Sequence, residues 1–177
     1  MIRRFVIFAA AFALITQSAF AQNPVKQAKA GEVVRLTEGL TLRVTKAVKS
    51  PFGKVKVTGE PFVLVLELDA GLKETGLSYL ITADAKTSEV SLTSGNQRVA
   101  PRAVVEDFPS WGEDNDKEAE LISPRDKGAA SISFRKTGSI SLLFDLPANQ
   151  PAAARKLSLV LRTFKPSEEQ HSLVVTL

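Results

Sequence analysis

The sequence predicts an all-β fold, with antiparallel strands packed as a sandwich or closed as a barrel. Apolar and polar residues alternate with a period of two, and turn-forming residues separate these runs at short intervals. No long stretch has the 3.6-residue period of an amphipathic helix. A strand with period-two alternation buries one face and exposes the other to solvent. The pattern therefore indicates many short strands around one core.

The strand candidates differ in how regular this alternation is. It is clearest in residues 40–45, 139–146, 157–161 and 173–177. Residues 62–68 are apolar on both faces for most of their length, which indicates a central strand covered on both sides. Weaker candidates cover residues 33–36, 55–57, 77–81, 90–93 and 131–134.

The N-terminus has the three parts of a secretory signal peptide. Arg3 and Arg4 form a positive start, and residues 5–15 form an almost unbroken apolar run. A small-x-small pattern that ends at Ala21 supplies the cleavage site. The apolar run is shorter than the roughly 20 residues of a membrane-spanning helix. We therefore expect cleavage after Ala21 rather than a retained anchor.

The composition fits an exported domain with an ordinary hydrophobic core. We assign residues 1–21 to the signal peptide, residues 22–30 to a flexible polar leader and residues 31–177 to one β domain. The chain has no Cys, so its stability comes from packing rather than from disulfides. Without residues 1–21 it has 21 basic and 19 acidic side chains, a net charge of +2. This balance argues against a nucleic-acid partner, and no later segment is apolar enough to span a membrane. We expect a periplasmic or secreted protein.

Three segments together resemble a known family. They cover residues 39–44, 61–68 and 138–147, and the last contains an apolar-Phe-x-apolar-Pro pattern from Leu143 to Pro147. Their order and spacing resemble a bacterial family of exported immunoglobulin-like domains of unknown function, sometimes called immunoprotective extracellular proteins. The resemblance implies an immunoglobulin-like antiparallel β-sandwich, and it brings no catalytic residue with it.

Two features depart from that family pattern. Asp69 stands where the family often has Asn at the end of a central strand. Residues 101–128 form a longer insertion, which is rich in acidic residues and for which a short helix over residues 116–122 is one possibility. The predicted fold is thus an immunoglobulin-like sandwich with one long acidic insertion.

The acidic insertion is the first candidate site. Seven carboxylates lie within residues 106–120, and oxygen-rich loops suit Ca²⁺. The candidate ligands are Asp114, Asp116 and Glu118. The segment lacks the later Gly and Glu of an EF-hand loop, so a solvated, self-repelling loop is the simpler interpretation. We predict no cofactor, with Ca²⁺ binding or a cation-dependent hydrolase that uses this insertion as the alternative.

Basic residues gather in a second segment, because no acidic residue lies between Glu38 and Glu60. On a predicted hairpin, Lys54 and Lys56 share one face. Such a face has three interpretations: a solvent-exposed surface without a partner, an edge strand whose lysines prevent aggregation, or a binding surface for an anionic polymer or an acidic protein. Trp111 is an aromatic candidate for a contact of this kind. The candidate partner-binding residues are Arg43, Lys46, Lys49, Lys54, Lys56 and Trp111.

The chain has a single histidine, His171, which follows a predicted hairpin turn. A Ser-His-Asp triad would have to use it, but no Gly-x-Ser-x-Gly elbow is present. We interpret His171 as a solvated side chain at the start of a strand. The sequence thus predicts a non-catalytic, exported binding or accessory domain in the cell envelope or the extracellular space. Its expected partner is an envelope or extracellular protein or an anionic polymer.

Overall fold

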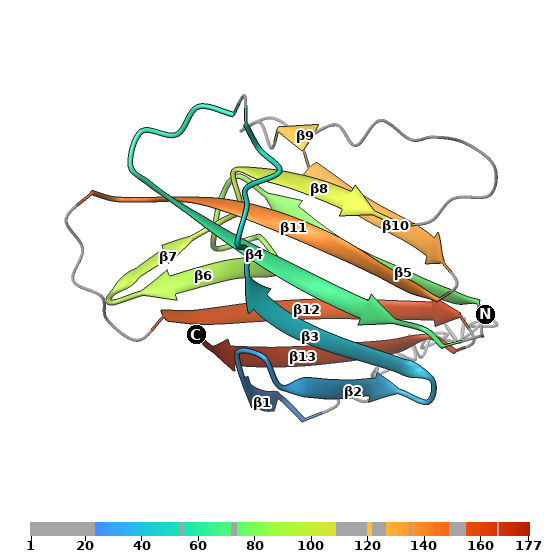
Figure 1. Cartoon of the computed structure of the whole chain (residues 1–177). Coiled ribbons are helices and arrows are strands. Elements are labelled where there is room, and N and C mark those ends of the chain that lie inside the picture. Colours follow the sequence, from blue (N-terminus) through green and yellow to red (C-terminus); the bar gives the residue numbers. More distant parts are fainter. Residues whose placement is uncertain are drawn as a thin grey trace, which may run out of the picture.

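A computed structural model of the chain consists of β-strands and their connections in the part that it describes (Figure 1). The predicted signal peptide, residues 1–21, lies outside that part. The described residues are 24–53, 55–71, 74–108, 120–121, 127–134, 136–148, 155–165 and 167–177. Their strands are β1 (Lys26–Lys29), β2 (Val33–Thr37), β3 (Leu40–Lys46), β4 (Glu60–Asp69), β5 (Thr75–Thr82), β6 (Val90–Ser94), β7 (Gln97–Val99), β8 (Ala103–Asp107), β9 (Glu120–Leu121), β10 (Lys127–Phe134), β11 (Thr137–Leu146), β12 (Arg155–Lys165) and β13 (Glu169–Thr176).

These strands form two sheets that pack face to face. Sheet A has the order β1-β13-β12-β5-β10, with β6 also paired to β12 and β7 paired to β6. Sheet B has the order β2-β3-β4-β11-β8-β9. Of the pairings between described strands, β1 with β13 is parallel and the others are antiparallel. The predicted all-β sandwich is confirmed.

Strand β12 pairs with two different strands along one edge. Its first half pairs with β6, and its second half pairs with β5. Glu89 lies where the two partners meet. Its carbonyl oxygen accepts a hydrogen bond from the Val160 amide (2.9 Å), and its carboxylate accepts one from the Leu80 amide (2.9 Å). The same carboxylate pairs with the Arg162 guanidinium on the outer face of β12. Glu89 therefore holds β5, β6 and β12 in register.

The main core lies between the sheets and comes from the alternating positions that the sequence predicted. Each strand presents every second side chain to the opposite sheet. Phe144 on β11 is fully buried in this core. Burying a side chain of this size contributes roughly 1.5–3 kcal/mol. The core-facing residues include Leu40, Leu42, Val44, Leu64, Leu66, Leu77, Ile81, Ile140, Leu142, Phe144, Leu157, Leu159, Leu161, Leu173 and Val175.

A second, smaller apolar cluster covers part of the outer face of sheet B. The connection between β3 and β4 supplies Phe52, which is 4% exposed, and strand β4 supplies Val63. Leu143 of β11 packs on the same face. The prediction that the strand at residues 62–68 is covered on both sides is therefore confirmed at Val63. Farther along this face, Glu67 is partly exposed.

Several sequence expectations are wrong in detail. Residues 55–57 are not a strand, although Val55 and Val57 pack on the second cluster as their spacing suggested. The predicted flexible leader contains β1, which is held by backbone hydrogen bonds to β13. The predicted insertion begins with β8, and its residues 120–121 are a strand rather than part of a helix.

Candidate functional site

The predicted metal ligands Asp114, Asp116 and Glu118 lie outside the described residues. Two carboxylates of the acidic segment are described, those of Glu106 and Asp107. Glu106 on β8 accepts a hydrogen bond of 2.5 Å from the hydroxyl group of Tyr79 on β5, which ties sheet B to sheet A. Within the described ranges, no group of three or more His, Cys, Asp or Glu side chains is placed to hold a metal ion. Nor do these ranges contain a helix with the length and apolar character needed to cross a bilayer.

The predicted basic residues have separate surroundings. Arg43 lies directly across from Glu67 on the neighbouring strand, and its Nε donates to the Glu67 carboxylate over 2.6 Å. Lys49 and Lys56 are exposed in the connection between β3 and β4, which is not the hairpin that we predicted. Lys54 and Trp111 lie outside the described residues.

Lys46, the remaining member of the basic set, belongs to a charged cluster at one end of the sandwich. The cluster is built around Phe62, which is 5% exposed. The Nζ of Lys46 lies 5.4 Å from the centre of the Phe62 ring, and the Cζ of Arg155 lies 4.5 Å from it. Lys46 comes from sheet B and Arg155 from sheet A, so cations from both sheets meet at one ring. Glu60 lies 3.5 Å from Nη2 of Arg155.

Two polar atoms in this cluster are buried without a partner. Among the residues that the structure describes, neither Arg155 Nε nor Ser94 Oγ has a hydrogen-bond partner. The two residues face each other in the β12–β6 pairing. Neither residue was among the candidates predicted from the sequence. One signal could have indicated Arg155. Leu157 and Leu159 face the core with a period of two, and the same period continued back along the strand places Arg155 on that face.

A cavity of about 280 Å³ lies on the outer face of sheet A, near the turn between β12 and β13. The wall formed by Phe164 depends on Gly76 of β5, because the ring lies against the Cα of that glycine. The guanidinium of Arg162 forms another wall and is paired with Glu89. The lining residues are Ser78, Arg162, Thr163, Phe164, Glu168, Glu169 and Gln170.

The lining of the cavity contains more acidic than basic residues, Glu168 and Glu169 against Arg162. Arg162 is paired with Glu89, and the Glu169 carboxylate lies 4.0 Å from Nε2 of His171. An aromatic ring beside carboxylates is the environment that attracts an organic cation, since the face of the ring is electronegative. Phe164 supplies such a ring.

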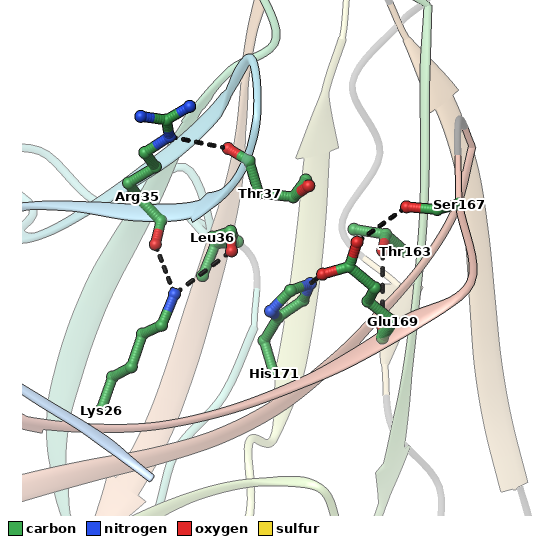
Figure 2. Close-up of polar contacts among 8 residues, drawn as sticks. All are labelled: Lys26, Arg35, Leu36, Thr37, Thr163, Ser167, Glu169 and His171. Carbon is green, nitrogen blue, oxygen red and sulfur yellow. Dashed lines mark hydrogen bonds and ion pairs between the residues drawn. The ribbon is translucent and has the colours of Figure 1, made fainter. Parts of the chain in front are cut away.

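His171 lies in the interior of the sandwich, not at its surface. Its side chain is 1% exposed, so our interpretation of it as a solvated residue is wrong. No described residue forms a hydrogen bond with either ring nitrogen, and the Glu169 carboxylate lies 4.0 Å from Nε2 (Figure 2). A catalytic triad needs an imidazole that is hydrogen-bonded on both sides. His171 does not form one with the described residues.

Lys26 closes the edge of the sandwich beside His171. Its Nζ crosses from β1 in sheet A and donates to the backbone oxygens of Arg35 (2.6 Å) and Leu36 (3.2 Å) on β2 in sheet B (Figure 2). Burial lowers the pKa of His171, the Glu169 carboxylate offsets part of this shift, and the Lys26 ammonium lowers the pKa further. His171 is therefore neutral at physiological pH.

No family model matches the chain, and no curated protein matches it. Among solved structures, it is similar to MPT63, a secreted protein from Mycobacterium tuberculosis, with 13% identity over 87% of this chain and 98% of that chain and a TM-score of 0.40. It is also similar to a family 123 glycoside hydrolase from Clostridium perfringens (9% identity, 86% of this chain, 22% of that chain, TM-score 0.26) and to the yeast δ-COP μ-homology domain (8% identity, 78% and 53%, TM-score 0.24). Likenesses of this size carry no conclusion about function. The architecture rests on the strand pairing of this chain itself.

Proposed function

We propose that this chain is a non-catalytic binding or accessory domain that is exported and acts in the cell envelope or outside the cell. The signal-peptide pattern over residues 1–21 supports export. The immunoglobulin-like character of the sandwich is part of this proposal. It is supported by the antiparallel sheets and by the short strand β1, which runs parallel to β13 and extends one sheet at its edge.

The cavity on the outer face of sheet A is the observation that carries the binding function. Its lining combines an aromatic residue, Phe164, with two acidic residues, Glu168 and Glu169. Its volume is close to the lower end of the range for small-molecule sites. A ligand with a flat apolar body and a cationic group matches both features of the lining. We propose a small organic cation, free or as part of a larger molecule, as the ligand class.

The proposal is tested with benzylammonium and benzoate, two probes of similar size and opposite charge. We expect benzylammonium to shift the backbone amide signals of residues 162–170 in two-dimensional NMR spectra, and benzoate to leave them unchanged at the same concentration. Phe164→Ala or Glu168→Gln should weaken benzylammonium binding by about tenfold, because each removes one attractive group. Ser172→Ala, on the outer face of β13 beyond the cavity, is the control and should bind as the wild type does. Equal shifts with both probes would contradict the proposed ligand class.

A further inference from the structure

We propose that the end of the sandwich around Phe62 is a binding site for an oxyanion group, that is, a carboxylate, phosphate or sulfate. The site is distinct from the cavity that carries the proposed function. Arg155 begins β12, and Phe164 lies nine residues later on the same strand, which corresponds to about 30 Å along an extended chain. The two sites can therefore be tested separately.

Two positively charged side chains come together at the ring of Phe62. Lys46 and Arg155 lie 5.4 Å and 4.5 Å from the centre of the Phe62 ring, and they reach it from opposite sheets. Cations are attracted to the face of an aromatic ring, so Phe62 holds both charges in place. Two cations fixed near one another repel, and an anion between them removes that repulsion.

The site also contains two buried hydrogen-bond donors that have no acceptor among the described residues. Within the described part of the chain, Arg155 Nε and Ser94 Oγ have no partner, although both atoms are buried. Ser94 is 1% exposed and lies directly across from Arg155 in the strand register, which places the two side chains on the same face of sheet A. A buried donor without an acceptor is unfavourable. An oxyanion accepts hydrogen bonds from a guanidinium group and a hydroxyl group together, and the planar guanidinium suits such a group well.

Glu60 is the internal competitor for this position. Its carboxylate lies 3.5 Å from Nη2 of Arg155, longer than the 2.7–3.2 Å of a good N–H···O hydrogen bond. The contact leaves Nε unfilled, and the Glu60 side chain is 52% exposed. A ligand oxyanion can therefore displace Glu60 into solvent without uncovering the core.

The experiment measures thermal unfolding of the protein in sodium phosphate and in sodium chloride of equal ionic strength. A bound anion stabilises the folded state by mass action, so the melting temperature should rise in phosphate beyond its value in chloride. Arg155→Gln should abolish the phosphate-specific rise, and Lys46→Gln should reduce it. Lys156→Gln removes an exposed charge from the next position of β12 and is the matched control, with the wild-type rise expected.

Two further variants separate a binding site from a cluster that only supports the fold. Ser94→Ala removes a buried hydroxyl group that has no partner, so the melting temperature in chloride should stay the same or increase. The same variant should weaken phosphate binding by about tenfold, because one hydrogen bond to the anion is lost. Glu60→Gln removes the competitor and should tighten phosphate binding several-fold.

Three results would overturn the proposal. The first is that the wild type melts at the same temperature in phosphate and in chloride. The second is that Lys156→Gln reduces the phosphate-specific rise as much as Arg155→Gln does. The third is that Ser94→Ala shows the same phosphate-specific rise as the wild type. The source of the oxyanion is distinguished by comparing orthophosphate, citrate and a linear polyphosphate. Binding that is much tighter for polyphosphate at equal phosphate concentration assigns the site to an anionic polymer, whereas equal binding assigns it to small anions.

Discussion

The ring of Phe164 lies so close to Gly76 that a Cβ atom at residue 76 would come within 2.2 Å of the ring atom Cε2. The two residues are on adjacent strands of sheet A, beside the register shift between Thr163 and Lys165. Sheet B has a similar relationship, because a Cβ atom at Gly138 would lie 2.0 Å from Cδ1 of Phe108. Covering a strand glycine with an aromatic ring restores packing that the missing side chain would otherwise provide.

Gly76→Ala should displace the Phe164 ring and lower the free energy of unfolding by about 1–3 kcal/mol, the usual cost of overpacking. The ring is at the end of a rotatable side chain, so the chain should still fold. In a Phe164→Ala background the same substitution should cost less, because the clashing atoms are gone. Urea unfolding of the four proteins forms a double-mutant cycle. Additive effects would show that the contact does not couple the two residues.

Gly59 should tolerate substitution far less well, because the obstacle there is backbone. A Cβ atom at Gly59 would lie 1.8 Å from the carbonyl oxygen of Leu146. We expect Gly59→Ala to cost about 3 kcal/mol or more, since strand β11 would have to move. Gly53→Ala is the control, because no atom lies within 4 Å of a Cβ atom at Gly53. Its expected change is within about 0.5 kcal/mol. Urea midpoints that agree for the two variants would contradict this account.

The strands that could be predicted from the sequence are those with a regular alternation of apolar and polar side chains. Strand β3 has Leu40 and Leu42 on its buried face, and such alternation is local information. Strand β1 was missed because its sequence, Lys-Gln-Ala-Lys, is polar, and it is held by backbone pairing with β13. Strand β8 was missed because Ala103 and Val105 pack on the second cluster while Val104 faces the main core, so no alternation marks it.

The candidate sites were harder to predict, because they depend on contacts between distant residues. The alternation of its strand shows from the sequence which face Lys46 lies on. The sequence does not show that Lys46 and Arg155 both lie over the ring of Phe62. The burial of His171 was missed for a related reason. The residues before it are polar and turn-forming, whereas its burial depends on distant residues: β1 pairs with β13, and Lys26 of β1 bonds to the backbone of β2 in the other sheet.

His171 should make the stability fall as the pH decreases below neutrality. Its pKa in the folded protein is lowered by burial, while an unfolded histidine has a pKa of about 6.5. Between these two values the unfolded state binds more protons, so stability is lost as the pH falls from about 6.5 toward the folded pKa. Glu169 on β13 and Lys26 on β1 are the charged groups that affect it.

Two measurements test the role of His171. It is the only histidine of the chain, so its ring C–H signal in a proton NMR titration reports the folded pKa directly. We expect that pKa to be below 6.5. His171→Leu should remove most of the pH dependence of the urea midpoint between pH 7.5 and pH 5, and it should cost little at neutral pH, because two unpaired nitrogens are removed. An equally steep dependence in the variant would assign the effect to other groups.

Asp145 should control a second loss of stability at lower pH. Its Oδ2 accepts hydrogen bonds from the backbone amide and the hydroxyl group of Thr58, both at 2.9 Å, and its Oδ1 accepts one from the Gly59 amide at 2.7 Å. Burial favours a higher pKa, but these hydrogen bonds and the charge of Arg102 outweigh it, so the pKa of Asp145 is lowered. The carboxylate thus fixes the turn that leads into β4.

The sign of the effect follows from that shift. A carboxylate with a lowered folded pKa contributes stability above its unfolded pKa of about 3.9, and this contribution is lost as the pH falls through the folded pKa. Asp145→Asn should therefore cost about 1–2 kcal/mol at pH 7 and flatten the decline of the melting temperature between pH 5 and pH 2. Thr58→Val removes the hydroxyl donor and keeps the carboxylate, so its effect should have the same direction and a smaller size. If Asp145→Asn lost stability in acid as steeply as the wild type, the acid sensitivity of the fold would have to come from other carboxylates.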